Sequence, residues 1–413
     1  MSVPERPRLV GAEAIPFQWQ GQDYLRISSR DGLTREALVL PKTATLLLQL
    51  LDGTRTTEEI KRAFEQTYFA PLVEGQLEEV LTRLDNLYLL HNTRRENKLR
   101  DTIDEFRQAT IREPSHAGGS YPSDPDQLRS LIDGMFASPG GPGLPRSSPK
   151  PNGRVGGILS PHIDFQRGGN SFAWGFRELV DHADADTFVI LGTGHYTSER
   201  FTLTRKDFRT PLGILRNDRE LTDLIARHYG DGVFEEEIAH RPEHSIEFQV
   251  LFLQHLVAAR REIGFVPILV GSFHDTVEAS REPVSQGEIR RMIEAIRESV
   301  SSLGRKVCYI SSGDLAHIGM KFGDPWTIDE SRRAQCERAD RELLSGLESG
   351  QGNDLFRNIN QENDIRRVCG FPPTYTMLEV LRPESGRLLQ YDQYVDERGF
   401  EIVSFASMAF YTS

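Results

Sequence analysis

Histidine and aspartate side chains recur in this sequence shortly after apolar runs. The residues concerned are His162 and Asp164, His195, His274 and Asp275, and Asp314 and His317. Four of the eleven histidines occupy such positions. In open α/β sheets, ligands bind beyond the carboxyl ends of the strands, so side chains from several such positions can meet. If the apolar runs are parallel strands, the sequence predicts a shared site at one rim of a sheet.

Two further stretches contain groups that could join this site. "HRPEHSIEFQ" places Glu243, His244 and Glu247 at the start of an expected helix, and "RRVCGFPPTY" places Cys369 ahead of a proline-started helix. Neutral imidazole suits Fe, Zn and Cu, carboxylate is a hard anionic ligand, and thiolate is a soft one. A thiol near a helix N-terminus loses its proton more readily, which makes it a better ligand or nucleophile. A metal site built from two histidines and one anion is therefore plausible.

Each of these residues also has an ordinary structural interpretation. A histidine after a strand often hydrogen-bonds the backbone of a loop, and Asp314 with His317 could form a turn with a surface imidazole. Cys369 could be a small buried apolar residue, which is the expected role of Cys308 inside "KVCYI". Cys336 lies on a polar helix and carries no signal. The recurrence of histidine at several strand ends favours the shared site.

The elements that would position these residues alternate between strand and helix. Apolar runs at "VGGILS", "TFVILG", "IGFVPILVGS" and "KVCYISS" are separated by stretches with helical spacing. This alternation predicts an α/β domain over residues 106–413, with a mostly parallel sheet flanked by helices. The final apolar runs come close together, so we expect them to add antiparallel strands. Residues 138–153 are rich in Pro, Gly and Ser and predict a flexible surface loop.

Residues 1–105 predict a separate small domain and a connecting helix. Three helical segments lie between a strand-like start, "DYLRISSR", and a strand-like end, "LYLLHN". Thr56 and Glu59 have the spacing of a capping box at the start of the second helix. This order is typical of a winged-helix-like module. The charged stretch that follows, "NTRRENKLRDTIDEFRQATIRE", predicts the connecting helix.

Composition excludes several classes of protein. A chain of 413 residues exceeds the ~250 to 300 residues at which single cores stop growing, so two domains, or one large domain with an appendage, are expected. No segment is apolar enough to span a membrane, and the net charge of −12 opposes nucleic-acid binding. The N-terminus lacks the layout of a signal peptide, and three cysteines make a poor disulfide framework. We therefore expect a cytoplasmic protein that binds neither membrane nor nucleic acid.

The chain from about residue 112 to residue 413 resembles the Memo family, also called AmmeMemoRadiSam system protein B. The matching stretches, in order, are "SHAGGSYPSDPDQL", "SPHIDFQRGG", "VILGTGHY", "FRTPLGILRND", "EHSIEFQ", "VPILVG", "SSGDLAHIG" and "VCGFPP". The resemblance implies the fold of LigB-type class III extradiol dioxygenases. It also implies His162, His195 and Cys369 as metal ligands, with Cys369 where the dioxygenases use a carboxylate. The family's other motif residues fall on Asp314 and His317 and on Glu243, His244 and Ser245, and "SSGDLAHIG" would line the pocket opposite the ligands.

Residues 20 to 92 resemble PqqD-like domains, on the order of "LLDGTRTTEEI" and "VEGQLEEVLTRLDNLYLL". That resemblance implies that a peptide is held along a strand edge. A DNA-reading winged helix is the alternative, and the acidic third helix argues against it. The Memo resemblance further implies a radical-SAM enzyme and an AMMECR-type protein as partners, beside a small-molecule or peptide substrate.

These observations favour a metal-dependent oxidoreductase with Fe(II), while Cu or Zn are possible. His317 or His244 could act as general acid or base, because an imidazole titrates near neutrality. Asp314 and Glu243 could orient those imidazoles or add ligands. The alternative is a non-catalytic module that binds a peptide or protein in a dioxygenase-like pocket. A Zn hydrolase is disfavoured because the sequence has no HExxH-like pair.

Overall fold

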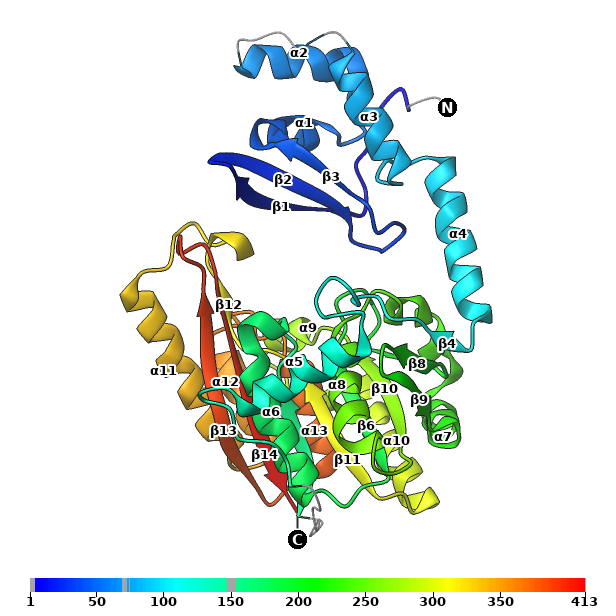
Figure 1. Ribbon diagram of the computed structural model, residues 1–413, viewed down its shortest axis with the longest axis vertical. Coiled ribbons are helices and arrows are strands. Elements are labelled where there is room, and N and C mark those ends of the chain that lie inside the picture. The colour runs from blue at the N-terminus through cyan, green and yellow to red at the C-terminus, as the bar shows by residue number, and fades with distance from the viewer. Residues whose placement is uncertain (1–3, 69–72, 74, 147–153, 413) are drawn as a thin grey trace. The chain divides into compact units, whose positions relative to one another are not determined.

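The chain forms two compact units, Met1–Ala109 and Thr110–Ser413 (Figure 1). The computed structural model describes residues 4–68, 73, 75–146 and 154–412. The second unit is an α/β structure with a large mixed sheet and helices on both faces, which confirms the predicted fold class. None of the helices in the described ranges is both long and apolar enough to cross a membrane.

The first unit has an antiparallel sheet followed by helices. The strands are β1 (Ala12–Trp19), β2 (Gln22–Ser29) and β3 (Ala37–Pro41), paired in that order. The helices are η1 (Lys42–Ala44), α1 (Thr45–Leu50), α2 (Thr57–Tyr68), α3 (Gln76–Asn86) and α4 (Thr93–Gln108). The expected capping box is present, since Thr56 N–H donates to Glu59 at 2.8 Å and Glu59 N–H donates to Thr56 Oγ1 at 3.3 Å. The strand expected at 87–92 is wrong: this segment contributes only an isolated bridge between Leu9 and Leu90.

The sheet of the second unit has the order β12-β14-β5-β11-β6-β10-β9-β8-β4, with β13 paired to β14 and β7 paired to β10. Its strands are β4 (Ile111–Arg112), β5 (Val155–Ser160), β6 (Thr187–Thr193), β7 (Phe201–Leu203), β8 (Asp207–Thr210), β9 (Gly213–Asn217), β10 (Gly264–Val270), β11 (Val307–Ser312), β12 (His317–Ile318), β13 (Ser385–Val395) and β14 (Ile402–Tyr411). The neighbouring strands β5, β11, β6 and β10 are parallel, whereas β13 and β14 are antiparallel, as expected. The carboxyl ends of β5, β11 and β6 therefore meet at one rim.

Alternating side chains of the parallel strands build a core on each face of this sheet. In β6, Val189 and Leu191 belong to one apolar cluster, while Phe188 and Ile190 belong to the other. The helices are α5 (Pro125–Ala137), α6 (Phe165–His182), α7 (Arg219–Tyr229), η2 (Asp231–Phe234), η3 (Glu237–His240), α8 (Ser245–Leu253), the π-turn η4 (Gln254–Ala258), α9 (His274–Glu278), η5 (Pro283–Ser285), α10 (Gly287–Leu303), η6 (Met320–Phe322), α11 (Glu330–Leu347), α12 (Gly352–Gln361) and α13 (Phe371–Leu381). Helices α5, α6 and α8 cover one face, and α7, α10, α12 and α13 cover the other. Burial on both faces explains why these strands are continuously apolar.

Part of the loop predicted to be flexible is bound to α6. Trp174 Nε1 donates to the carbonyl of Gly140 at 2.9 Å, and Arg177 donates to the carbonyls of Gly143 at 2.9 Å and Leu144 at 2.5 Å. The remainder of that segment, 147–153, lies outside the described residues. Flexibility of the loop stays a prediction.

Candidate metal centre

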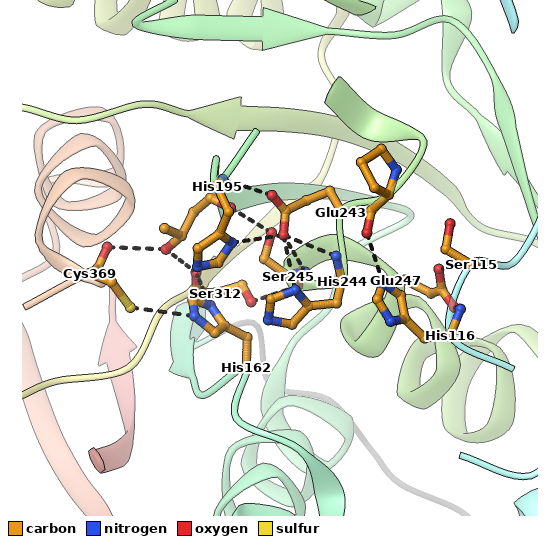
Figure 2. A network of polar contacts seen from close by, with 12 residues as sticks. Ser115, His116, His162, His195, Glu243, His244, Ser245, Glu247, Ser312 and Cys369 are labelled. Carbon is orange, nitrogen blue, oxygen red and sulfur yellow. Dashed lines mark hydrogen bonds and ion pairs between the residues drawn. The ribbon is translucent and has the colours of Figure 1, made fainter. Parts of the chain in front are cut away.

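Loops that follow β5, β6 and β11 bring their polar residues together at the rim of the sheet (Figure 2). His162, His195 and Asp314 each come two positions after the end of one of these strands. His244 joins them from the position before α8, and Cys369 joins them from the turn before α13. The sequence expectation that distant loops share one site is therefore realised in the geometry.

Three imidazoles pack against one another in this site. The ring centroids of His162 and His195 are 5.0 Å apart, those of His195 and His244 are 4.9 Å apart, and those of His162 and His244 are 5.2 Å apart. Each ring offers a nitrogen atom, and these nitrogens lie within 4.8 Å of one another. His162 is buried, whereas the other two rings are half-buried. The spacing allows the three nitrogens to converge on one ion.

Glu243 holds the Nδ1 side of two of these rings, His195 and His244. Its Oε1 accepts a hydrogen bond from His195 Nδ1 at 2.9 Å and lies 3.3 Å from His244 Nδ1. Its carboxylate also accepts the backbone N–H groups of His195 at 2.8 Å, His244 at 3.0 Å and Ser245 at 3.1 Å. Burial raises the pKa of Glu243, but the adjacent His195 and His244 and these N–H donors hold it below its usual range. An ionised Glu243 keeps the Nε2 atoms of both rings available to a ligand.

His162 is fixed by backbone groups and by Asp314. Its Nδ1 lies 3.2 Å from the carbonyl of Ser312, and its backbone N–H donates to Asp314 Oδ1 at 3.0 Å. Its Nε2 lies 3.4 Å from Cys369 Sγ and 3.7 Å from Asp314 Oδ2. Burial, reinforced by His195, lowers the pKa of His162 to about 3. The ring is therefore a neutral imidazole, which is the form that binds metals.

The Cys369 thiol is not the acidic thiol that its place before a helix predicted. Burial and the Asp314 carboxylate raise the pKa of Cys369 well above its usual value. Removal from water disfavours thiolate, and a neighbouring negative charge disfavours it further. These two effects outweigh the lowering of the thiol pKa that the nearby helix N-terminus was expected to cause. A bound cation would reverse this balance, because a coordinating thiol is deprotonated.

Two glycines allow the Asp314 and Cys369 loops to meet. A Cβ atom on Gly313 would lie 2.2 Å from the Cα of Gly370, and one on Gly370 would lie 2.7 Å from the carbonyl oxygen of Asp314. Gly370 N–H donates to that carbonyl at 2.9 Å. The close approach places Asp314 beside Cys369 and His162, rather than opposite the ligands as expected.

His317 contacts the backbone of the cysteine loop. Its Nδ1 lies 3.1 Å from the carbonyl of Leu315 and 3.2 Å from that of Arg367. Both are acceptors, so Nδ1 carries the hydrogen and Nε2 has the lone pair. Burial lowers the pKa of His317, although Asp314 opposes this effect. The ring is a neutral imidazole with one basic nitrogen.

Four other residues from the sequence patterns lie outside this cluster. Asp164 caps helix α6, where it accepts the backbone N–H of Arg167 at 3.1 Å. His274 is 55% exposed and pairs with Glu278 at 3.5 Å, and Asp275 pairs with Arg200. Glu247 forms a fully buried ion pair with Arg112. Glu247 also accepts the backbone N–H groups of Ser115 at 3.0 Å and His116 at 3.1 Å, and the hydroxyl of Tyr121. Its carboxylate therefore anchors a neighbouring segment.

Some supporting residues were not singled out from the sequence. Ser312 orients His162 through its carbonyl, and Thr193 Oγ1 donates to that carbonyl at 3.0 Å and to the carbonyl of Cys369 at 3.1 Å. Both residues end the strands that carry site loops, which is the signal that could have found them. His116 packs against the outer side of the site. Its ring centroid lies 5.6 Å from that of His244, and its Nε2 lies 2.8 Å from the carbonyl oxygen of Pro242.

The donors of this site fit a first-row transition metal. Imidazole Nδ1 atoms held by carboxylate or carbonyl oxygens are typical of metal-binding histidines. His162 belongs to two groups of donors, one with His195 and His244 and one with Asp314 and Cys369. The combination of imidazole, thiol and carboxylate suits Fe(II), Cu and Zn alike.

Comparison with known proteins assigns the chain to a family. A family model described as Memo-like protein matches residues 112–409. The chain belongs to the Memo family. A MEMO1 family protein of Aquifex aeolicus is 31% identical over 384 residues, which cover 92% of this chain and 94% of the relative. A MEMO1 family protein of Methanopyrus kandleri is 29% identical over 308 residues, which cover 72% of this chain and 98% of the relative.

These Memo relatives differ in how much of the chain they match. The alignment to the Aquifex protein is longer than the second unit, so it extends into the first unit. The Methanopyrus protein is matched almost end to end by an alignment about as long as the second unit. The family model covers nearly all of the second unit, which contains the whole candidate metal centre.

Proposed function

We propose that this Memo family chain is a metal-dependent redox protein that binds Fe(II), or alternatively Cu, through His162, His195 and Cys369. The observation that supports it is the convergence of Cys369 Sγ on His162 Nε2 at 3.4 Å, with the His195 ring against His162. His195 and Cys369 belong to different donor groups around His162, so joint binding requires both side chains to draw closer to one point. When bound, such an ion supplies open positions for O2 or substrate and a change of oxidation state.

The surrounding residues orient groups and move protons. Glu243 holds Nδ1 of His195, so that Nε2 of this ring is presented to the site. His317 has Nδ1 tied to two carbonyls, and its Nε2 is the base that accepts a proton from substrate. His244 is the second candidate base, and Asp314 orients His162 through its backbone N–H.

The metal content of the full chain tests this proposal. Protein purified anaerobically is analysed for iron, copper and zinc, together with Cys369→Ala and, as a matched control, Cys308→Ala, which lies buried in β11 away from the donors. We expect a bound redox metal in the wild type and in Cys308→Ala, and a sharp loss in Cys369→Ala. Unchanged iron and copper in Cys369→Ala would argue strongly against the proposal.

A second candidate function is a non-catalytic module that binds a peptide or protein, with the first unit presenting a peptide. It is favoured by apolar side chains on the outer face of the first sheet, where Trp19 is 60% exposed, Val39 is 45% exposed and the Phe17 and Tyr24 rings stack at 5.8 Å. Oxygen uptake by the metal-loaded protein separates the two functions, because a pure binder consumes no O2.

A radical-SAM enzyme and an AMMECR-type protein are proposed partners. We also propose a cytoplasmic location, which the three free thiols would suit.

A further inference from the structure

His162 is the donor common to both groups in the site. One group contains His162, His195 and His244, and the other contains His162, Asp314 and Cys369. In each group the donor atoms lie within 4.8 Å of one another. Two adjacent groups of three donors could hold two ions together, or one ion in either of two ways.

The hydrogen bonding of His162 decides between these arrangements. Its Nδ1 lies 3.2 Å from the carbonyl oxygen of Ser312, which can only accept a hydrogen bond. Nδ1 therefore carries the hydrogen, and Nε2 has the only lone pair that can bind a metal. Nε2 is also the atom that faces Cys369 and Asp314. One lone pair serves one ion, so the two groups are alternatives for a single ion.

His244 has the same support as its neighbour His195. Oε1 of Glu243 contacts the Nδ1 atoms of both residues, at 2.9 Å for His195 and 3.3 Å for His244. The two rings stack with an interplanar angle of 19°. A ring whose Nδ1 is fixed by a carboxylate keeps Nε2 for a ligand, which is the arrangement of metal-binding histidines. His244 is therefore equipped to bind an ion.

We propose that His244 is a metal-binding residue and that the centre holds one ion in either of two ligand sets, which share His162. The three-imidazole set suits nitrogen-preferring Cu(II), and the set with the Cys369 thiolate suits soft Cu(I). This inference rests on the proposed function in that the centre binds metal. It replaces joint binding by His162, His195 and Cys369 with two alternative sets, so that His195 and Cys369 do not hold the ion at the same time. It adds that the softness of the ion selects its ligands.

Cu(II) binding by the full chain tests the imidazole set. The measurements use a Cys369→Ser background, which prevents the thiol from reducing Cu(II). Copper affinity is measured by competition with a chelator, and the bound nitrogens are observed by electron paramagnetic resonance. Adding His244→Ala is expected to weaken Cu(II) binding by about tenfold or more and to remove one nitrogen coupling. Adding His274→Ala, which removes an exposed imidazole outside both groups, is expected to change neither.

Cu(I) binding under anaerobic conditions tests the thiolate set. Cys369→Ser is expected to weaken Cu(I) binding by about tenfold or more, whereas His244→Ala leaves it within about threefold of the wild type. His162→Ala should weaken the binding of both ions. Circular dichroism checks the fold of each variant, and His244→Gln replaces His244→Ala if the latter fails to fold.

The outcomes separate this inference from the proposed function. If His244→Ala and His244→Gln leave Cu(II) affinity and the nitrogen couplings unchanged while Cys369→Ser weakens Cu(I) binding, the inference is overturned and the proposed function stands. If His162→Ala and Cys369→Ser bind both ions like the wild type, the proposed function fails and the inference fails with it.

Discussion

Cys369 Sγ lies 3.4 Å from His162 Nε2, although 207 positions separate the two residues in the chain. Neither group is charged in this arrangement, because burial lowers the pKa of His162 to about 3 and raises that of Cys369 well above its usual value. The neutral thiol and the neutral imidazole therefore do not form an ion pair with each other. The centre is therefore prepared for a cation, whose charge would draw out the thiol proton.

Glu243→Gln is expected to weaken metal binding by about 10 to 100-fold. Oε1 faces the Nδ1 atoms of both His195 and His244, and Oε2 accepts the backbone N–H of His195. An amide must turn its NH2 donor toward one of these sets of N–H groups, and it also lacks the negative charge that holds them. Chelator competition on the full chain measures the change. Glu236→Gln is the control, since Glu236 also accepts hydrogen bonds in the loop after β6, from Thr197 and Ser198, but contacts none of the imidazoles. Equal losses in both variants would contradict the role of Glu243.

Gly313→Ala is expected to lower metal content. The added methyl group would lie 2.2 Å from the Cα of Gly370, so the loops that carry Asp314 and Cys369 must separate. Elemental analysis and thermal unfolding measure the two consequences. Gly134→Ala is the control, because no atom lies within 4 Å of its added Cβ and alanine favours the helix α5. Full metal content in Gly313→Ala would show that the close approach is dispensable.

Removal of one partner from the Arg112–Glu247 pair is expected to cost about 3 to 5 kcal/mol in the free energy of unfolding. Both side chains are fully buried, so Arg112→Met leaves an uncompensated carboxylate and Glu247→Leu leaves an uncompensated guanidinium. The double variant Arg112→Met/Glu247→Leu should recover part of the loss. Urea denaturation of the four proteins measures the coupling. Additive losses in the double variant would contradict a direct interaction.

Acid is expected to destabilise the fold through His240. Burial lowers the pKa of His240 to about 3 from 6.5, so the unfolded chain binds a proton that the folded chain does not. Stability from this group is complete above pH 6.5 and is lost as the pH falls toward the folded value. The loss reaches about 3 kcal/mol near pH 4.

His240→Gln isolates this contribution, because glutamine can still donate to the carbonyl of Thr202, which His240 Nε2 contacts at 3.0 Å. Urea midpoints are compared at pH 7 and near pH 4 for both proteins. The wild type should lose more stability than the variant over this range. The same loss in both proteins would exclude His240 as the source.

The rim of the sheet and many of its site residues could be predicted from the sequence, since parallel strands align their carboxyl ends. The alignment of strand ends does not determine how many positions beyond a strand a residue can lie and still reach the site. His162 and His195 come two positions after their strands, whereas His274 comes four positions after β10, begins α9 and faces solvent. The acidity of Cys369 was predicted wrongly, because burial beside Asp314 depends on the tertiary fold. The role of Glu243 as a shared acceptor likewise requires three-dimensional coordinates.

The apolar clusters of the chain divide at the same place as its units. In the first unit, one cluster is built from residues between Leu9 and Leu90. In the second unit, two large clusters are built from residues between Ala117 and Tyr411. In the described part of the chain these clusters have no member in common. Heating is therefore expected to melt the two units in separate steps, so a single melting temperature would not describe this protein. Only the melting temperature of the second unit, which contains the candidate metal centre, should rise when copper or iron is added.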